Sequence, residues 1–114
     1  MYPTAFDYVA PTSVEETLAI LADGGEDVKV LAGGQSLIPL MKLRLATPEK
    51  LVDINRVPGL DPIEVVDGLL RVGAMARHNA IANSDVVKAE NRTMAAAAPW
   101  ISDPLVRNVG TVGG

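Results

Sequence analysis

A predicted strand that runs directly into two glycines and then into a predicted helix constrains the fold more than any other feature of the chain. Residues 28–32 form a short β run, and Gly33-Gly34 follow it without a break. Ser36 can cap a helix over residues 37–43. The third residue of that helix is a proline, which the first turn tolerates because its missing N–H is not needed there. The sequence therefore predicts a strand, a tight turn and a helix in quick succession.

The residues on either side of this junction predict further regular structure. Ser13 and Glu16 have the spacing of a capping box, and apolar residues recur after them at helical intervals. Gly24-Gly25 supply the stop for that helix. A second strand is predicted over residues 50–54. The order strand, helix, strand favours parallel pairing with a right-handed crossover.

The second half of the chain predicts a hairpin. Two short β runs, residues 63–66 and 69–73, flank Asp67-Gly68, which is a strong signal for a two-residue turn.

A longer helix is predicted over residues 85–98, opened by Ser84 and closed by Pro99. The alanine run near its end suits close helix packing. The predicted class is therefore α/β (α+β), with a small mixed sheet, parallel pairing near the N-terminus, the hairpin and flanking helices.

Composition narrows the function. The chain has 114 residues, 48% apolar and 21% charged, which is typical of a globular domain. Its formal charge is −4, its basic residues are scattered, and it has four aromatic residues, so nucleic-acid binding is a poor hypothesis. It has no cysteine and one histidine, so we expect neither an iron–sulfur cluster nor a metal site. No transmembrane run and no secretory signal is recognisable, and we expect a cytoplasmic protein.

Two glycine-rich segments could carry chemistry. The first is Ala32-Gly33-Gly34-Gln35-Ser36, between the predicted strand and helix. Adjacent glycines allow a diphosphate to approach the backbone N–H groups closely, the start of the following helix adds the positive end of its dipole, and the Gln and Ser side chains can add neutral hydrogen bonds. A plain glycine turn explains the same residues equally well. The segment matches neither the G-x-G-x-x-G fingerprint nor the phosphate loop that ends in Gly-Lys-Ser/Thr.

The second segment is residues 110–114, which place three glycines and one hydroxyl within five positions. Taken alone, it could be a frayed terminus. Two such loops far apart in the sequence could instead grip opposite sides of one extended, negatively charged ligand.

Three other side chains are better explained by structure than by chemistry. We expect His78 to lie on the surface or at a helix start, since no nucleophile or orienting carboxylate is recognisable near it. We expect Trp100 to pack against the core. Arg107 could pair with a phosphate or equally well form a surface salt bridge. We therefore predict no catalytic residue.

Four segments in order resemble the FAD-binding (medium) subunits of the molybdenum hydroxylase family, with most likeness to carbon monoxide dehydrogenase medium subunits. These segments are residues 30–45, 51–54, 72–75 and 103–114, and together they extend over essentially the whole chain. The resemblance implies an FAD-binding domain of the vanillyl-alcohol-oxidase (PCMH) type, in which two glycine loops hold the FAD pyrophosphate through backbone N–H groups. Carried over residue by residue, the FAD-binding positions are Ala32, Gly33, Gly34, Gln35, Ser36, Leu37, Gly73, Ala74, Gly110, Thr111, Gly113 and Gly114.

The resemblance also implies a role and partners. A large partner subunit would hold the molybdopterin, and a small partner subunit would hold two [2Fe–2S] clusters. Electrons would pass from those clusters to FAD and on to an acceptor, so the flavin subunit relays electrons and makes no bond to the substrate.

Family subunits are more than twice as long as this chain. We therefore expect residues 1–114 to be the N-terminal portion of an FAD-binding domain, to bind FAD weakly when isolated, and to self-associate through apolar surface. Two alternatives stay open. One is a non-catalytic remnant of such a domain that binds a nucleotide or a protein. The other, weaker one is a sulfur carrier or ubiquitin-like modifier, because Gly113-Gly114 end the sequence.

Overall fold

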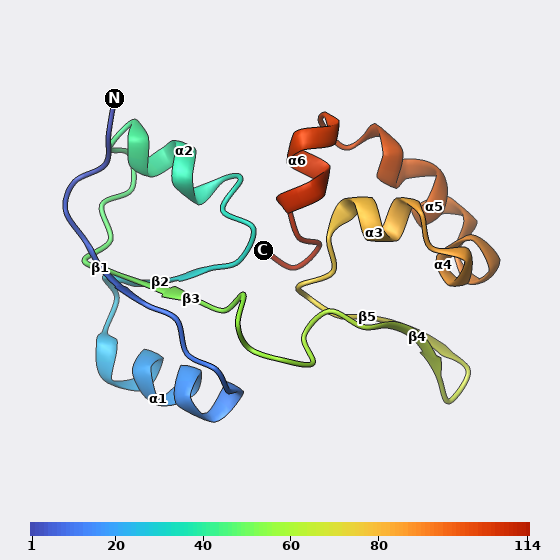
Figure 1. The fold of residues 1–114 in the computed structure, drawn as a ribbon, viewed down its shortest axis with the longest axis horizontal. Coiled ribbons are helices and arrows are strands. Elements are labelled where there is room, and N and C mark those ends of the chain that lie inside the picture. Colours follow the sequence, from blue (N-terminus) through green and yellow to red (C-terminus); the bar gives the residue numbers. More distant parts are fainter. The chain divides into compact units, whose positions relative to one another are not determined.

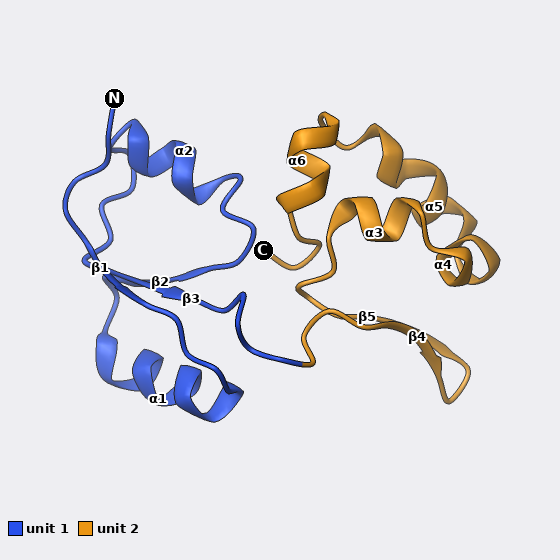
Figure 2. Cartoon of the chain, viewed as in Figure 1, with its two compact units in different colours: residues 1–58 blue, residues 59–114 orange.

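The chain forms two compact units, residues 1–58 and 59–114 (Figure 2). The computed structural model describes all residues from Met1 to Gly114. Helices and strands alternate in the first unit, whereas a hairpin is followed by a run of short helices in the second (Figure 1).

The first unit is built on a three-stranded parallel sheet. Its strands are β1 (Asp7–Val9), β2 (Val28–Leu31) and β3 (Lys50–Asp53), arranged in the order β1-β3-β2. Tyr8 and Lys29 both pair with Leu51 of the central strand. The two predicted strands and their parallel pairing are confirmed. Strand β1 was not predicted, because three residues are too few to establish an alternating pattern.

Helix α1 (Val14–Gly24) has the predicted cap. The Ser13 hydroxyl accepts a hydrogen bond from the Glu16 N–H at 3.1 Å, and the Glu16 carboxylate accepts one from the Thr12 N–H at 3.1 Å. The helix ends at Gly25, whose φ of 73° suits glycine. It packs against β3, in which Val52 is completely buried.

Helix α2 (Leu37–Lys42) follows the glycine turn, and Pro39 lies in its first turn as predicted. Ser36 occupies the capping position but does not cap the helix, because its own backbone is helical (φ −104°, ψ −47°) and its hydroxyl makes no cap hydrogen bond. Met41 is the buried residue of this helix, with 3% of its surface exposed.

The second unit begins with the predicted hairpin, formed by β4 (Ile63–Val66) and β5 (Leu69–Val72). Asp67 and Gly68 have φ values of 51° and 78°. Two successive positive φ values are what a type I′ turn requires.

Five short helical segments follow the hairpin. They are α3 (His78–Ala82), α4 (Asp85–Glu90), α5 (Arg92–Ala97), the 3₁₀ turn η1 (Ala98–Trp100) and α6 (Pro104–Val109). The prediction of one helix over residues 85–98 is wrong. Asn91 leaves the helical conformation (φ −147°, ψ 89°), and its side-chain oxygen caps α5 by accepting from the Met94 N–H at 3.0 Å.

Ile81, Val87 and Ala98 form the core of the second unit together with Ala76. Of the alanine run, Ala98 is buried in this core and Ala95 is half-buried, whereas Ala96 and Ala97 are exposed, so only part of the run serves packing. Trp100 is 86% exposed, so the expectation that it packs against the core is wrong. The 3₁₀ turn carries its indole outward.

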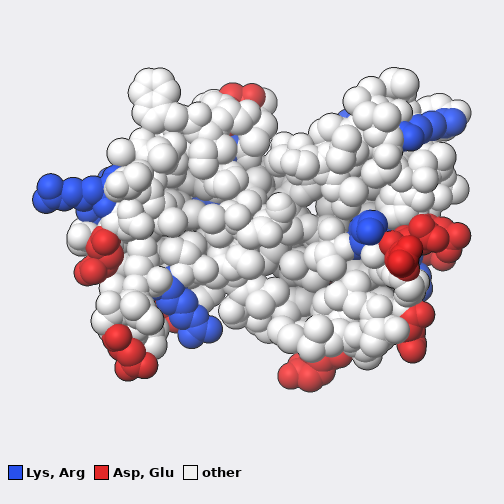
Figure 3. All heavy atoms as spheres, turned by 180° about the vertical axis from the view of Figure 1, so that it is seen from behind, with Lys and Arg blue, Asp and Glu red and all other residues white.

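The α/β class is confirmed, with one difference in detail. Parallel and antiparallel pairing are both present but occupy two separate sheets instead of one mixed sheet. No helix is long and apolar enough to cross a membrane. No group of three or more His, Cys, Asp or Glu side chains could hold a metal ion. On the face shown in Figure 3, lysine and arginine side chains do not gather into one positive patch.

Candidate functional site

Four carbonyl groups of the first glycine loop accept hydrogen bonds from within the protein. The Ala32 carbonyl accepts from the Asn55 side-chain amide at 2.8 Å, and the Gly34 carbonyl accepts from the Ile38 N–H at 3.0 Å. The Gly33 carbonyl accepts a longer hydrogen bond, 3.4 Å, from the Gln35 side chain. The Ser36 carbonyl accepts from the fourth residue of α2 at 3.2 Å.

The N–H groups of the same loop are unpaired. From Gly33 to Leu37, no backbone N–H donates a hydrogen bond to the protein. Every peptide bond is trans, so each N–H points away from the carbonyl in its own plane. Four carbonyls are held by hydrogen bonds within the protein, so the N–H groups in the same peptide planes, those of residues 33, 34, 35 and 37, point away from these partners and are left for an external acceptor. Unpaired N–H groups in such a turn are suited to an anion.

Side chains at the loop fit the same interpretation. Gly34 has a φ of 77°, and a Cβ there would lie 2.7 Å from the Cδ1 of Ile38 and 3.1 Å from the Cδ1 of Leu31. This position therefore requires glycine, both for its conformation and for the close approach. The Ser36 hydroxyl, which does not cap α2, remains available to a ligand.

A polar network at the carboxyl end of β3 supports the loop. The Tyr8 hydroxyl donates to one oxygen of Asp53 at 2.5 Å, and the other oxygen accepts from the backbone N–H and the side-chain amide of Asn55 at 2.9 and 2.6 Å. Two opposing effects act on the pKa of Asp53. Partial burial alone would raise this pKa, but the hydrogen bonds from Tyr8 and Asn55 and the nearby positive charge of Arg56 have the larger combined effect. The pKa of Asp53 is therefore below its usual value. The hydrogen bond to Asp53 raises the pKa of Tyr8.

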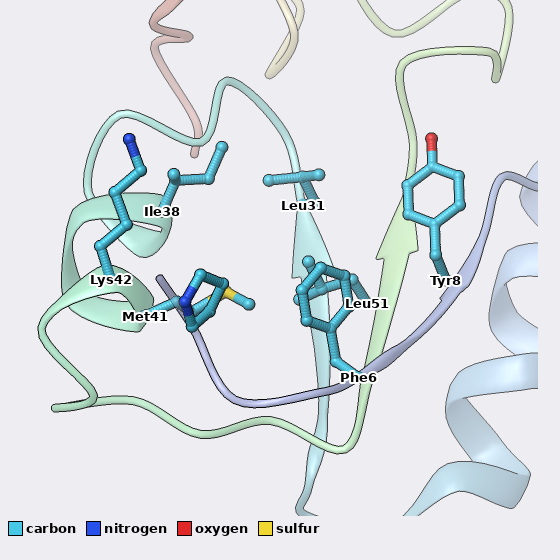
Figure 4. A pocket seen from close by; sticks show the side chains of 8 residues that line it. Phe6, Tyr8, Leu31, Ile38, Met41, Lys42 and Leu51 are labelled. Atoms are coloured by element: carbon cyan, nitrogen blue, oxygen red, sulfur yellow. The ribbon is translucent and has the colours of Figure 1, made fainter. Parts of the chain in front are cut away.

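An apolar pocket of about 220 Å³ lies between α2 and the sheet (Figure 4). Figure 4 shows Ile38 and Met41 entering it from α2, and Leu31 and Leu51 entering it from the strands. Leu31 and Ile38 also flank Gly34, so the pocket and the first loop share part of their wall. Its other lining residues are Pro3, Phe6, Tyr8 and Lys42.

The second glycine loop differs from the first because most of its N–H groups are already used. The Gly110 N–H donates to the Val106 carbonyl at 2.7 Å, and the N–H groups of Val112 and Gly113 donate to the carbonyls of residues 76 and 74 at 3.0 and 2.9 Å. The interpretation of residues 110–114 as a frayed terminus is therefore wrong. The amides of Gly110 and Gly113 hold the segment in the second unit and are not left over for a ligand.

The Thr111 side chain is the buried side-chain polar group of this loop that has no hydrogen-bond partner. The residue is 7% exposed, and its hydroxyl is buried without a hydrogen-bond partner. Its backbone N–H makes no hydrogen bond within the protein, although it pairs with Arg77 in an isolated antiparallel bridge. A buried hydroxyl without a partner is unfavourable unless a ligand supplies one. Gly114 also retains an unpaired N–H.

The glycines around Thr111 are explained by packing. A Cβ on Gly110 would lie 3.0 Å from the His78 ring, and a Cβ on Gly113 would lie 2.6 Å from the Cβ of Ala74. A Cβ on Gly73 would lie 2.3 Å from the Leu60 carbonyl oxygen. The Gly73 N–H donates to the carbonyl of residue 62 at 2.7 Å, whereas the Ala74 N–H has no protein acceptor.

Two residues that the sequence left ambiguous have structural roles. His78 is the first residue of α3, as expected, and its N–H donates to the Gly110 carbonyl at 3.1 Å. The Arg107 guanidinium donates to the backbone carbonyls of Ile101 and Ser102 at 3.3 and 3.2 Å. Arg107 therefore forms no salt bridge, and its guanidinium instead holds the turn that precedes α6.

Fold and loops together define a class: an α/β protein in which a strand, a glycine turn and a helix leave consecutive amides unpaired. The chain belongs to the family described as the FAD binding domain in molybdopterin dehydrogenase, whose model matches residues 4–114. Each loop therefore offers unpaired donors: five backbone amides in the first loop, and the buried hydroxyl of Thr111 in the second.

Proteins of known activity resemble the chain along its whole length. It is 48% identical to the alpha subunit of the 6-hydroxypseudooxynicotine dehydrogenase complex of Paenarthrobacter nicotinovorans, covering 100% of this chain and 38% of that protein. It is 49% identical to the carbon monoxide dehydrogenase medium chain of Hydrogenophaga pseudoflava, covering 100% of this chain and 40% of that one. The chain therefore spans about two fifths of the length of these relatives.

Solved structures agree with these relationships. A structure of carbon monoxide dehydrogenase from Hydrogenophaga pseudoflava superimposes with a TM-score of 0.97 at 49% identity, over 100% of this chain and 40% of that one. Quinoline 2-oxidoreductase from Pseudomonas putida 86 gives a TM-score of 0.95 at 38% identity, over the same shares. The relatives are subunits of dehydrogenases, as the sequence resemblance implied.

Proposed function

We propose that residues 1–114 are the N-terminal portion of the FAD-binding subunit of a molybdenum-containing dehydrogenase, and that both glycine loops bind the FAD diphosphate. The observation that carries the proposal is the set of unpaired amides from Gly33 to Leu37, all in peptide planes of one short turn. An anion that accepts these hydrogen bonds supplies partners for groups that the fold leaves without any.

The second loop contributes through Thr111 and the terminal amide. The buried Thr111 hydroxyl is a neutral donor, and the N–H groups of Thr111, Ala74 and Gly114 are also unpaired. Gly110 and Gly113 act by removing side chains that would collide with His78 and Ala74. Among the predicted binding positions, we therefore assign these two glycines and Gly73 to shaping the second loop. The donors are residues 33–37, Ala74, Thr111 and Gly114, whereas Ala32 contributes the carbonyl that Asn55 holds.

The role of the bound cofactor follows from the family. FAD, when bound, exchanges electrons with redox centres, and the protein supplies binding and orientation. In this proposal, electrons come from [2Fe–2S] clusters of a small partner subunit, after substrate oxidation at a molybdopterin in a large one. Two of the relatives are named as a subunit of a complex and as a medium chain, which supports such an assembly. The chain itself makes no bond to the substrate.

A nitrogen-15 labelled sample of the chain tests the binding proposal, because amide shifts detect weak complexes. Titration with FAD and with ADP to about 5 mM covers dissociation constants in the millimolar range. We expect the amide resonances of residues 33–37 and Thr111 to move together, whereas those of helix α1 stay fixed. If neither ligand moves the loop resonances, the proposal is wrong.

Comparing the affinities for FAD and ADP distinguishes a flavin domain of a dehydrogenase from a domain that binds only a nucleotide. If FAD and ADP bind equally and move the same amides, the chain reads only the diphosphate and its adenosine. That outcome is the one expected of a non-catalytic nucleotide-binding remnant. Tighter binding of FAD supports a flavin domain.

A further inference from the structure

The peptide plane between Ala32 and Gly33 is held by a side chain from outside the glycine loop. The side-chain nitrogen of Asn55 donates to the Ala32 carbonyl at 2.8 Å, across 23 positions of sequence. That carbonyl and the Gly33 N–H belong to one planar trans peptide group, and they point in opposite directions. The direction of the Ala32 carbonyl therefore fixes the direction of the Gly33 N–H.

Asn55 is itself held by Asp53. The side-chain nitrogen of Asn55 lies 2.6 Å from the Asp53 carboxylate and 2.8 Å from the Ala32 carbonyl, so each of its two hydrogens has its own acceptor. The backbone N–H of Asn55 also donates to Asp53, at 2.9 Å. These contacts leave the Asn55 amide little freedom to rotate.

Tyr8 completes the network from another strand. Its hydroxyl donates to the second oxygen of Asp53. This side-chain hydrogen bond links β1 to the end of β3, in addition to the backbone pairing of the two strands. Charge-assisted hydrogen bonds of this kind are stronger than neutral ones. The carboxylate is thus fixed on both oxygens, and a neutral amide stands between its negative charge and the loop.

We propose that Asn55 is a positioning residue for the first glycine loop, and that Asp53 and Tyr8 hold it in place. It orients the Ala32–Gly33 peptide so that the Gly33 N–H is directed at the ligand before the ligand arrives. This inference rests on the proposed function for the nature of the ligand, a diphosphate. The orientation of the peptide is a property of the ligand-free chain and can be measured without one.

The experiment uses the labelled 114-residue chain with two Asn55 variants. Asn55→Leu keeps similar bulk and loses both amide hydrogens, whereas Asn55→Gln keeps the two hydrogens on a longer side chain. Asn83→Ala is the matched control, because Asn83 also donates from its side-chain amide to a backbone carbonyl, that of Asn79 at 2.9 Å, but in the second unit. The readouts are the Gly33 amide shift and order parameter without ligand, and the affinity for inorganic pyrophosphate.

We expect Asn55→Leu to move the Gly33 resonance, to lower its order parameter and to weaken pyrophosphate binding about tenfold, the loss of roughly one well-placed hydrogen bond. Asn55→Gln should recover part of each change, and Asn83→Ala should cause none. An unchanged Gly33 amide in Asn55→Leu overturns the proposal. So does an Asn55→Gln variant that matches Asn55→Leu in every readout, because the amide hydrogens would then not be the operative feature.

The positioning role of Asn55 and the binding of a diphosphate can fail independently of each other. If pyrophosphate moves no amide of the unmodified chain, the proposed function fails, and the ligand-free Gly33 readout still decides the positioning role. If Asn55→Leu disturbs resonances throughout the first unit, Tyr8→Phe decides instead, because it removes only the outermost hydrogen bond. Tyr8→Phe should shift the Gly33 resonance in the same direction by less, and no shift in that variant counts against the network.

Discussion

The N–H of Gly113 donates to the carbonyl of Ala74 at 2.9 Å, and the two residues are so close that a Cβ on Gly113 would lie 2.6 Å from the Cβ of Ala74. The contact joins the last residues of the chain to the segment that follows β5. It ties a glycine-rich segment to the rest of the second unit.

Gly113→Ala should therefore destabilise the second unit. The added methyl group must displace the backbone of residue 74, and overpacking of this kind costs about 1–3 kcal/mol. Urea unfolding followed by circular dichroism measures the change in free energy of unfolding. The double variant Ala74→Gly with Gly113→Ala removes one of the two colliding methyl groups and should recover part of the loss. A single variant as stable as the unmodified chain would show that the contact is not tight.

Thr111→Val should stabilise the ligand-free chain and weaken diphosphate binding. Valine has the same shape without the hydroxyl, which is buried and unpaired, so its removal should gain about 1 kcal/mol. Thr17→Val is the matched control, because Thr17 is also buried but its hydroxyl donates to the Ser13 carbonyl at 2.8 Å. That control should lose stability. If Thr111→Val gains nothing and binds pyrophosphate normally, the hydroxyl has no ligand role.

The stability contributed by Asp53 should disappear in acid. Its pKa is lower in the folded chain than the ordinary value of 3.8, so its contribution is complete above that value and is lost as pH falls through the lower, folded pKa. Urea unfolding of the unmodified chain and of Asp53→Asn, measured from neutral pH downward, tests this. The difference between them should be constant near neutrality and should shrink below pH 3.8. A difference that already shrinks well above this pH would contradict the assignment.

Tyr8 should show the opposite dependence. Its pKa is raised above 10.0, so its hydrogen bond persists to that pH and is lost only as pH rises through the raised value. An ultraviolet titration should contain a late tyrosinate step that is missing in Tyr8→Phe. In Asp53→Asn the step should move to lower pH.

The chain should self-associate through exposed apolar side chains of the second unit. Trp100 and Leu105 are the most exposed large apolar side chains of this unit, at 86% and 79%, and their burial against a second molecule is favourable in water. Replacing both, by Trp100→Ser and Leu105→Gln, should reduce the concentration dependence of the sedimentation coefficient. Leu45→Gln, in the first unit and 74% exposed, is the control and should leave it unchanged. A monomeric unmodified chain at all concentrations would contradict the prediction.

Local signals in the sequence were sufficient for the elements that depend on near neighbours. Asp67-Gly68 predicted the hairpin because the turn needs two positive φ values, and both occur. Ser13 and Glu16 predicted the start of α1 because the two hydrogen bonds of a capping box join residues only three or four positions apart. The break at Asn91 was missed because the apolar and alanine pattern continues across it, whereas a single asparagine that caps a helix resembles one that merely lies within it.

The candidate site was predicted unevenly for a related reason. The first loop could be located because the strand, the glycines and the helix are consecutive. In the second loop, glycine content alone could not show that the amides of Val112 and Gly113 pair with carbonyls nearly 40 positions earlier. The support from Asn55 was missed too, since its contact with Ala32 depends on how β2 and β3 align.

The central place of β3 sets an order in which the first unit can assemble. The two strands that flank β3 come earlier in the chain. Asp7 of β1 therefore has no strand partner until Lys50 of β3 has been synthesised. Closing such a long segment is slow compared with forming the adjacent hairpin of the second unit. On a ribosome, the N-terminal half would therefore remain open until residues 50–55 had emerged. The first glycine loop would acquire its fixed shape only at that late step, so FAD should find no preformed diphosphate site in a shorter nascent chain.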